Sequence, residues 1–195
     1  MNTKAELVFF AKWLRAPFRV ASVTPSGARL ARAMAAGLPD GEGLVIELGG
    51  GTGPVTQALL EAGVAPADLL VIERDRHFHR LLSQRFPGIS VLLGDAFDLE
   101  SLVEARGKRD SVRAIVSGLP MVPMGAKDQL RILRQALALT GGRGPFVQFS
   151  YGLASPIKPS VKADLGLSSR CVAQVWRNVP PARVWVYERD PATDH

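Results

Sequence analysis

The feature that most constrains the fold of this chain is a glycine-rich turn directly after a short apolar run. Residues 44–48 are Leu, Val, Ile, Glu and Leu, and they are followed by Gly49, Gly50, Gly51, Thr52 and Gly53. Residues 54–63 then show the apolar spacing of a helix. A strand that enters a helix through such a turn is typical of α/β domains, and its backbone amides can approach a ligand closely.

The spacing of these glycines excludes two common phosphate-binding loops. Gly49, Gly51 and Gly53 give G-x-G-x-G, whereas the dinucleotide pattern G-x-G-x-x-G would need a further glycine that is missing. The turn is not a P-loop either, because no Gly-Lys-Ser/Thr follows. Glycine turns also serve tight turning alone, so the loop by itself leaves a purely structural role equally open.

Beyond the turn, apolar runs alternate with periodic stretches, which predicts a mostly parallel α/β sheet. Strands are expected at residues 44–48, 69–73, 89–93, 113–117 and 145–150. Helices are expected at residues 54–63, 75–86, 98–106 and 126–139. Two further strand-like runs, residues 171–176 and 183–188, are joined by Asn-Val-Pro-Pro and predict a terminal hairpin.

The composition fits one globular domain of 195 residues, with 47% hydrophobic and 22% charged residues. No apolar run reaches the ~18 to 20 residues of a membrane span, and the start lacks a secretory pattern. Cys171 is the single cysteine, and the histidines (His77, His79, His195) lack metal-ligand spacing. We therefore expect no disulfide, no metal and a cytoplasmic location.

Acidic residues stand where two of the predicted strands end. Glu73 ends the second strand and Asp95 follows the third, so both are expected at the carboxyl edge of the sheet. A carboxylate like Glu73 can accept both hydroxyls of a ribose, and Asp95 can accept an adenine amino hydrogen while the Ala96 amide donates to the ring. Either residue alone could simply cap a helix. Together with the glycine turn, they favour one binding crevice.

The fourth strand ends in Ser117, Gly118, Leu119 and Pro120. A loop restricted by proline can direct backbone carbonyls at a reacting nitrogen. These four residues are therefore candidates for the catalytic part of the same edge.

The order of these features resembles the class I S-adenosylmethionine-dependent methyltransferases. The resemblance covers about residues 20–190 and implies a Rossmann-like, seven-stranded, mostly parallel sheet with an antiparallel last strand. It also implies that S-adenosylmethionine binds across the carboxyl edge, with Glu47 at its methionine end, Glu73 at the ribose and Asp95 at the adenine. The implied cofactor-binding residues are Thr24, Ser26, Glu47, Gly49, Gly51, Gly53, Glu73, Arg74, Asp95, Ala96 and Ser117.

Three further pieces resemble the small bacterial phospholipid N-methyltransferases, which convert phosphatidylethanolamine stepwise to phosphatidylcholine. They are Thr24-Pro25-Ser26, the loop at residues 117–120, and residues 178–182 followed by Val-Trp-Val-Tyr. Ribosomal RNA adenine N6-methyltransferases share part of this pattern, but they normally have Asn where Ser117 stands and a helical RNA-binding domain for which 195 residues leave no room. The lipid enzyme is favoured, with the RNA enzyme and a non-catalytic S-adenosylmethionine-binding module as alternatives.

The start of the chain is basic, since residues 1–32 hold six Lys and Arg against one Glu. On a helical wheel of residues 4–19, an apolar arc lies opposite a basic face, which predicts an amphipathic helix suited to a membrane with anionic lipids. From the wheel alone, packing on the protein body is the alternative. We expect one methyltransferase domain over residues 1–195, with residues 1–36 as a helical membrane-contact segment. Its predicted contacts are Phe9, Phe10, Lys12, Trp13, Arg15 and Arg19.

Methyl transfer to an amine requires a positioned neutral nitrogen rather than a nucleophilic triad. Tyr151 could orient that amine, or it could be an ordinary strand-end aromatic. Residues 152–165 could cover the crevice and place Lys158 and Lys162 on a lipid phosphate, or form a solvated loop. We expect a monomer bound to the inner face of the cytoplasmic membrane. The nearly neutral remainder of the chain does not favour nucleic acid.

Overall fold

In a computed structural model, the protein is described over residues 25–106, 112–176 and 181–190. The sheet has seven strands in the order β3-β2-β1-β4-β5-β7-β6. β1 to β5 pair in parallel, and β7 runs antiparallel to both β5 and β6. The strands are β1 (Leu44–Leu48), β2 (Leu69–Glu73), β3 (Ser90–Leu93), β4 (Val112–Ser117), β5 (Phe146–Ser150), β6 (Leu167–Val175) and β7 (Ala182–Arg189). The predicted Rossmann-like sheet with an antiparallel last strand is thereby confirmed.

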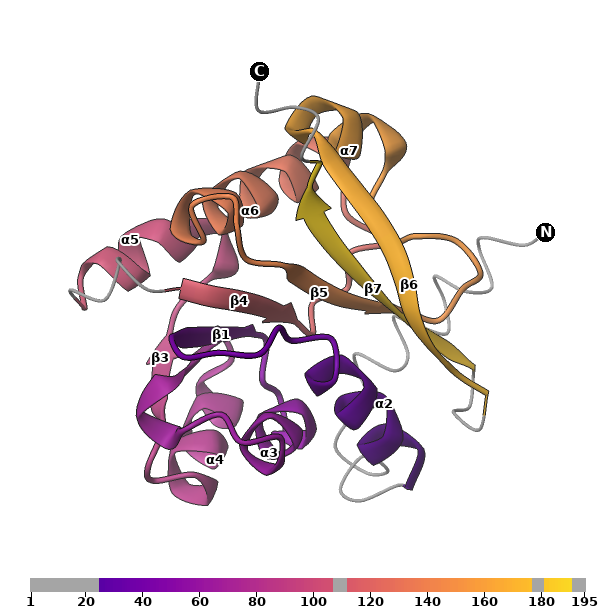
Figure 1. Ribbon diagram of the computed structural model, residues 1–195. Coiled ribbons are helices and arrows are strands. Elements are labelled where there is room, and N and C mark those ends of the chain that lie inside the picture. The colour runs from indigo at the N-terminus through magenta and orange to yellow at the C-terminus, as the bar shows by residue number, and fades with distance from the viewer. Residues whose placement is uncertain (1–24, 107–111, 177–180, 191–195) are drawn as a thin grey trace.

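Helices cover both faces of this sheet (Figure 1). On one face lie α2 (Pro25–Ala35), α3 (Pro54–Glu61) and α4 (Arg76–Arg85), and on the other lie α5 (Leu99–Glu104), α6 (Ala126–Leu139) and α7 (Pro159–Leu165). Two short 3-10 turns, η1 (Pro66–Asp68) and η2 (Ala96–Asp98), complete the order of elements. Every residue of β1, β2 and β5 is buried, as expected for strands covered on both faces.

Residues 152–165, expected as a loop, contain the helix α7. Pro159 begins this helix with its backbone already restricted to helical values, and Gly166 ends it in the left-handed conformation. Val161 is the residue of α7 that becomes buried, packing on the α6 face of the sheet. Because one buried side chain gives no periodic pattern, the sequence shows no helix here.

The predicted membrane-contact segment is described only from residue 25 onward. There α2 buries Leu30, Ala31 and Met34 in the same core cluster as α3. The predicted contacts of that segment and one predicted cofactor residue lie outside the described residues: Phe9, Phe10, Lys12, Trp13, Arg15, Arg19 and Thr24. Within the described part of the chain, no helix combines the length and the apolar character needed to cross a membrane.

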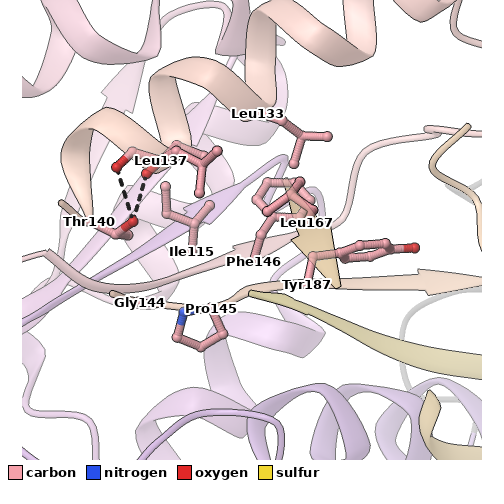
Figure 2. Close-up of a pocket in the computed structure, with 10 residues that line it drawn as sticks. Ile115, Leu133, Leu137, Thr140, Gly144, Pro145, Phe146, Leu167 and Tyr187 are labelled. Carbon is pink, nitrogen blue, oxygen red and sulfur yellow. Dashed lines mark hydrogen bonds between the residues drawn. The ribbon is translucent and has the colours of Figure 1, made fainter. Parts of the chain in front are cut away.

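A cavity of about 10 Å³ lies between α6 and the sheet, near the start of β5 (Figure 2). Its lining is mostly apolar, and the Thr140 hydroxyl donates back to the carbonyls of Ala136 and Leu137. A space of this size holds at most about one water molecule. It is a packing gap at the amino end of the strand, on the opposite side from the glycine turn, and it is too small for a substrate.

Candidate active site

Backbone hydrogen bonds hold the strand ends of the carboxyl edge together. The Gly49 nitrogen donates to the Ile72 carbonyl at 2.8 Å, and the Gly118 nitrogen donates to the Leu48 carbonyl at 2.8 Å. The Gly94 nitrogen donates to the Glu73 carbonyl at 3.1 Å. The structure therefore brings the glycine turn, Glu73, the Asp95 loop and the loop at residues 117–120 to one edge, as the sequence predicted.

The glycine turn needs its glycines for conformation and for close approach. Gly49, Gly51 and Gly53 have φ angles of 75°, 55° and 89°, which residues with a side chain rarely adopt. At Gly118 the reason is space, because a Cβ atom there would lie 2.8 Å from the Gly49 carbonyl oxygen. The turn after β1 and the loop after β4 consequently touch through their backbones.

Glu73 accepts a backbone hydrogen bond on each carboxylate oxygen. The Gly51 nitrogen donates to Oε2 at 3.0 Å, and the Asp75 nitrogen donates to Oε1 at 2.8 Å. A carboxylate oxygen has two lone-pair directions, so each oxygen keeps one for a ligand. Two adjacent acceptors held in this way fit the paired hydroxyls of a ribose.

Glu47 lies under the glycine turn, in the middle of β1, and is fully buried. The Thr56 hydroxyl of α3 donates to its Oε2 at 2.6 Å. Burial raises the pKa of the Glu47 carboxyl from 4.5 to about 7, and the Glu73 carboxylate adds to this rise, although the Thr56 hydrogen bonds oppose it. The contact with Thr56 fixes the start of α3 to β1, and the predicted contact of Glu47 with the methionine end stays a prediction.

Asp95 follows β3 and caps the turn η2, since its Oδ1 accepts from the Phe97 nitrogen at 3.0 Å. Its other oxygen lies 3.8 Å from a guanidinium nitrogen of Arg74, whose side chain is largely exposed, whereas the Asp95 side chain is partly buried. Ala96 is buried directly after it. Asp95 thus has the capping role considered from the sequence, and Oδ2 keeps acceptor capacity for a ligand.

The loop after β4 is supported from the α6 side by buried polar groups. The Ser117 hydroxyl oxygen accepts from the Leu119 nitrogen at 3.2 Å. From β5, the Gln148 side-chain nitrogen donates to the Leu119 carbonyl at 3.0 Å. Ser117 and Gln148 are direct neighbours across the sheet, and both are buried. The backbone of the predicted catalytic loop is therefore held in one position.

Gln129 of α6 joins this loop to the loop after β5. Its side-chain nitrogen donates to the carbonyls of Met121 at 2.7 Å and Pro156 at 2.9 Å. Its Oε1 accepts from the Lys158 nitrogen at 2.9 Å. A single buried amide thus uses three hydrogen bonds to fix the two loops beside each other, above the sheet edge where the cofactor is expected.

The remaining predicted residues lie in less decisive positions. Tyr151 follows β5, partly buried, with its ring edge-on to Phe149 at 5.3 Å between centroids. The Lys158 side chain is half-buried, and the Lys162 ammonium donates to the Ser169 hydroxyl at 3.0 Å. Ser26 lies in the first turn of α2. Their predicted roles stay predictions.

Similarity to one curated protein identifies the family of this chain. The chain is 34% identical over 142 residues to the ornithine lipid N-methyltransferase of Singulisphaera acidiphila, covering 69% of this chain and 73% of that protein. The chain belongs to the lipid N-methyltransferases. No protein-family model matches this lipid N-methyltransferase.

Solved structures agree with the fold. A TehB-like methyltransferase from Corynebacterium glutamicum matches with a TM-score of 0.61 and 18% identity, over 95% of this chain and 99% of that one. The phosphoethanolamine N-methyltransferase 1 of Haemonchus contortus, solved with phosphoethanolamine and S-adenosylhomocysteine, matches with a TM-score of 0.64 and 15% identity, over 98% and 50%. At these identities the likeness shows the class I methyltransferase fold.

Three residues that build the edge of this lipid N-methyltransferase were not predicted from the sequence: Thr56, Gln129 and Gln148. All three are polar, lie within otherwise apolar patterns and are buried. A polar residue on an apolar face is the available signal, because such a group is normally buried only with hydrogen-bond partners. Which backbone groups those partners are depends on loops that the sequence does not place.

Proposed function

We propose that this enzyme transfers methyl groups from S-adenosylmethionine to the primary amine of phosphatidylethanolamine, stepwise toward phosphatidylcholine, at the inner face of the cytoplasmic membrane. The observation that carries the lipid acceptor is the 34% identity to an ornithine lipid N-methyltransferase. The resemblance of Thr24-Pro25-Ser26 and of residues 117–120 and 178–182 to phospholipid N-methyltransferases favours phosphatidylethanolamine as that lipid. The carboxyl edge supports the proposal, because donors and acceptors suited to the cofactor lie beside a backbone loop suited to an amine.

The residues present fit the cofactor. Glu73 would hold the ribose hydroxyls, and Asp95 with the Ala96 amide would hold the adenine. The glycines of residues 49–53 would let the backbone approach the amino-acid part. When bound, S-adenosylmethionine supplies an activated sulfonium methyl group.

The chain contributes mainly by positioning the acceptor nitrogen. Carbonyl oxygens of the loop at residues 117–120, held by Gln148 and Gln129, are available to orient its N–H groups. Residues 117–127 and 151–163 contain no Asp or Glu. With no carboxylate in these two segments to stabilise the ammonium form, and with desolvation favouring the neutral form, the amine more easily loses its proton.

Ornithine lipid is a second candidate substrate, favoured by the activity named for the Singulisphaera acidiphila relative. Both lipids present a primary amine near an anionic group, so the same edge could serve either. The two differ in the spacing of amine and anion.

Competition between the two lipids tests the proposal. Vesicles containing phosphatidylethanolamine and ornithine lipid in equal amounts would be incubated with the enzyme and labelled S-adenosylmethionine, and the lipids separated by chromatography. We expect label in mono-, di- and trimethylated phosphatidylethanolamine. Label confined to ornithine lipid would show that ornithine lipid, and not phosphatidylethanolamine, is the substrate. Label in neither lipid would contradict the proposal.

A further inference from the structure

Within the described residues, the exposed large apolar side chains all follow or end strands at one edge of the sheet. They are Leu93, Val122, Leu153 and Trp176, with exposed fractions of 44%, 49%, 67% and 67%. The first ends β3, and the next two follow β4 and β5. Trp176 directly follows β6, at the end of the hairpin where β7 begins opposite the last residue of β6. Since β7 is antiparallel to β5, that end also lies at the carboxyl edge.

Three of these four residues lie at one corner. Arg183 of β7 pairs with Ser150, the last residue of β5, and its guanidinium donates to the Leu153 carbonyl. Gln129 connects Met121, next to Val122, with Pro156 in the loop that carries Leu153. Figure 1 shows the loop after β5 and the end of the hairpin where β6 ends and β7 begins projecting on the same side. We call Val122, Leu153 and Trp176 the apolar corner.

Leu93 lies at the other end of the same edge, because β3 and β6 are the two outermost strands. It is exposed and apolar like the corner residues, but it is separated from them by the strands that carry the cofactor residues. Leu93 is therefore a matched control for the apolar corner.

The charged residues are also distributed unevenly between the segment that carries the apolar corner and the segment that carries Leu93. Residues 111–187 hold ten Lys and Arg against only Asp128 and Asp164, whereas residues 33–110 hold seven Lys and Arg against twelve Asp and Glu. Arg183 and Lys158 belong to the segments that form the corner, and Lys127 lies exposed at the start of α6. The part of the chain that carries the proposed cofactor residues is therefore net acidic, whereas the part that carries the apolar corner is net basic.

We infer that the apolar corner docks on the surface of a lipid bilayer that carries anionic headgroups. Apolar side chains gain by entering the interface, where Trp is especially favoured, while neighbouring cations meet the headgroups. A second copy of the chain fits less well, since a symmetric contact would bring two basic corners together. The inference rests on the proposed function, because a lipid acceptor stays in the bilayer and the site must reach it.

Fluorescence quenching tests the contact directly in the full chain. The Trp13→Phe variant keeps Trp176 and Trp185, and vesicles of phosphatidylcholine and phosphatidylglycerol would carry bromine on their acyl chains. We expect quenching that is largely lost when Trp176→Phe is added. Equal quenching in both variants, or none in either, would overturn the inference.

Vesicle sedimentation gives a second test that does not depend on one probe. Combining Val122→Ser, Leu153→Ser and Trp176→Ser should weaken binding about tenfold or more, whereas Leu93→Ser should leave it unchanged. Binding of S-adenosylhomocysteine confirms that each variant is folded. Equal binding of the triple variant and the unsubstituted chain, or an equal loss in Leu93→Ser, would contradict the inference. Vesicle binding that does not depend on salt, and that structured RNA alone removes by competition, would contradict it as well.

These vesicles contain no amine-bearing acceptor, so docking is measured without turnover. If docking fails while the enzyme still methylates detergent-dispersed phosphatidylethanolamine, the inference is wrong and the proposed function stands. If docking succeeds and no lipid is methylated in any form, the proposed function is wrong and the surface remains a membrane contact.

Discussion

The backbone nitrogen of Gly51 donates to the Glu73 carboxylate at 3.0 Å, although the two residues are 22 positions apart in the chain. This bond joins the glycine turn after β1 to the end of β2, the two places that we propose to contact the cofactor together. Glu73 therefore organises the turn and still offers a free acceptor direction on each oxygen.

Replacing Glu73 with Ala should weaken the binding of S-adenosylhomocysteine by about ten- to a hundredfold, because hydrogen bonds to a charged group are worth about 1.5–3 kcal/mol. Isothermal titration calorimetry measures the change. Glu42→Ala, exposed beyond the opposite edge of the sheet, is the matched control and should bind normally. Unchanged affinity in Glu73→Ala would remove Glu73 from the cofactor site.

Glu47 should make the fold less stable as the pH rises. The unfolded carboxyl ionises near its ordinary pKa of 4.5, whereas the folded one keeps its proton up to a pKa of about 7. Folded protein therefore binds more protons between these values, and its stability falls by about 3 kcal/mol from about pH 4.5 to about pH 7 and levels off above.

Urea unfolding of Glu47→Gln at a series of pH values checks this. The amide can still accept from Thr56 but does not titrate, so this part of the pH dependence should disappear. The same pH profile in the unsubstituted chain and in Glu47→Gln would show that Glu47 is not its source.

Gly118→Ala should separate the turn after β1 from the loop after β4, because the new Cβ would lie 2.8 Å from the Gly49 carbonyl oxygen. Overpacking of this kind costs about 1–3 kcal/mol and should also lower methyl transfer. Gly152→Ala is the control, since no atom lies within 4 Å of its Cβ position. Equal thermal unfolding temperatures for Gly118→Ala and Gly152→Ala would refute the close contact.

Gln129→Leu should destabilise the enzyme by about 3 kcal/mol, because the carbonyls of Met121 and Pro156 and the Lys158 nitrogen lose their buried partner. The loops should also separate, so KM for the lipid should rise more than kcat falls. Gln57→Leu, on the exposed side of α3, should change stability by less than about 0.5 kcal/mol. Equal effects at both positions would contradict the role of Gln129.

The strands could be predicted closely where burial is complete. Predicted and observed bounds coincide for β1, β2 and α6, because uninterrupted apolar runs and a clear helical period leave little freedom. β6 begins four residues before the predicted start at residue 171, since its first residues alternate in exposure and carry Ser and Arg on the open side. The helix α7 could not be predicted, because only one of its side chains is buried and the sequence therefore shows no periodic pattern there.

The cofactor edge was predictable because each of its residues stands at the end of a strand, where topology fixes position. The support beneath it was not. Glu47 and Thr56 meet only because the turn folds back, and Gln129 and Gln148 hydrogen-bond to backbone atoms of distant loops. The spacing of residues along the sequence shows which residues end a strand. It does not show which backbone groups of distant loops a buried polar side chain contacts.

The most direct test of the account is transfer of labelled methyl from S-adenosylmethionine to vesicles of amine-bearing lipid, with structured RNA offered in the same reaction. We predict label in the lipid headgroup, no label in RNA, and no transfer by Glu73→Ala. Label in RNA alone, or no label in any lipid by a chain that binds S-adenosylhomocysteine, would contradict the central claim.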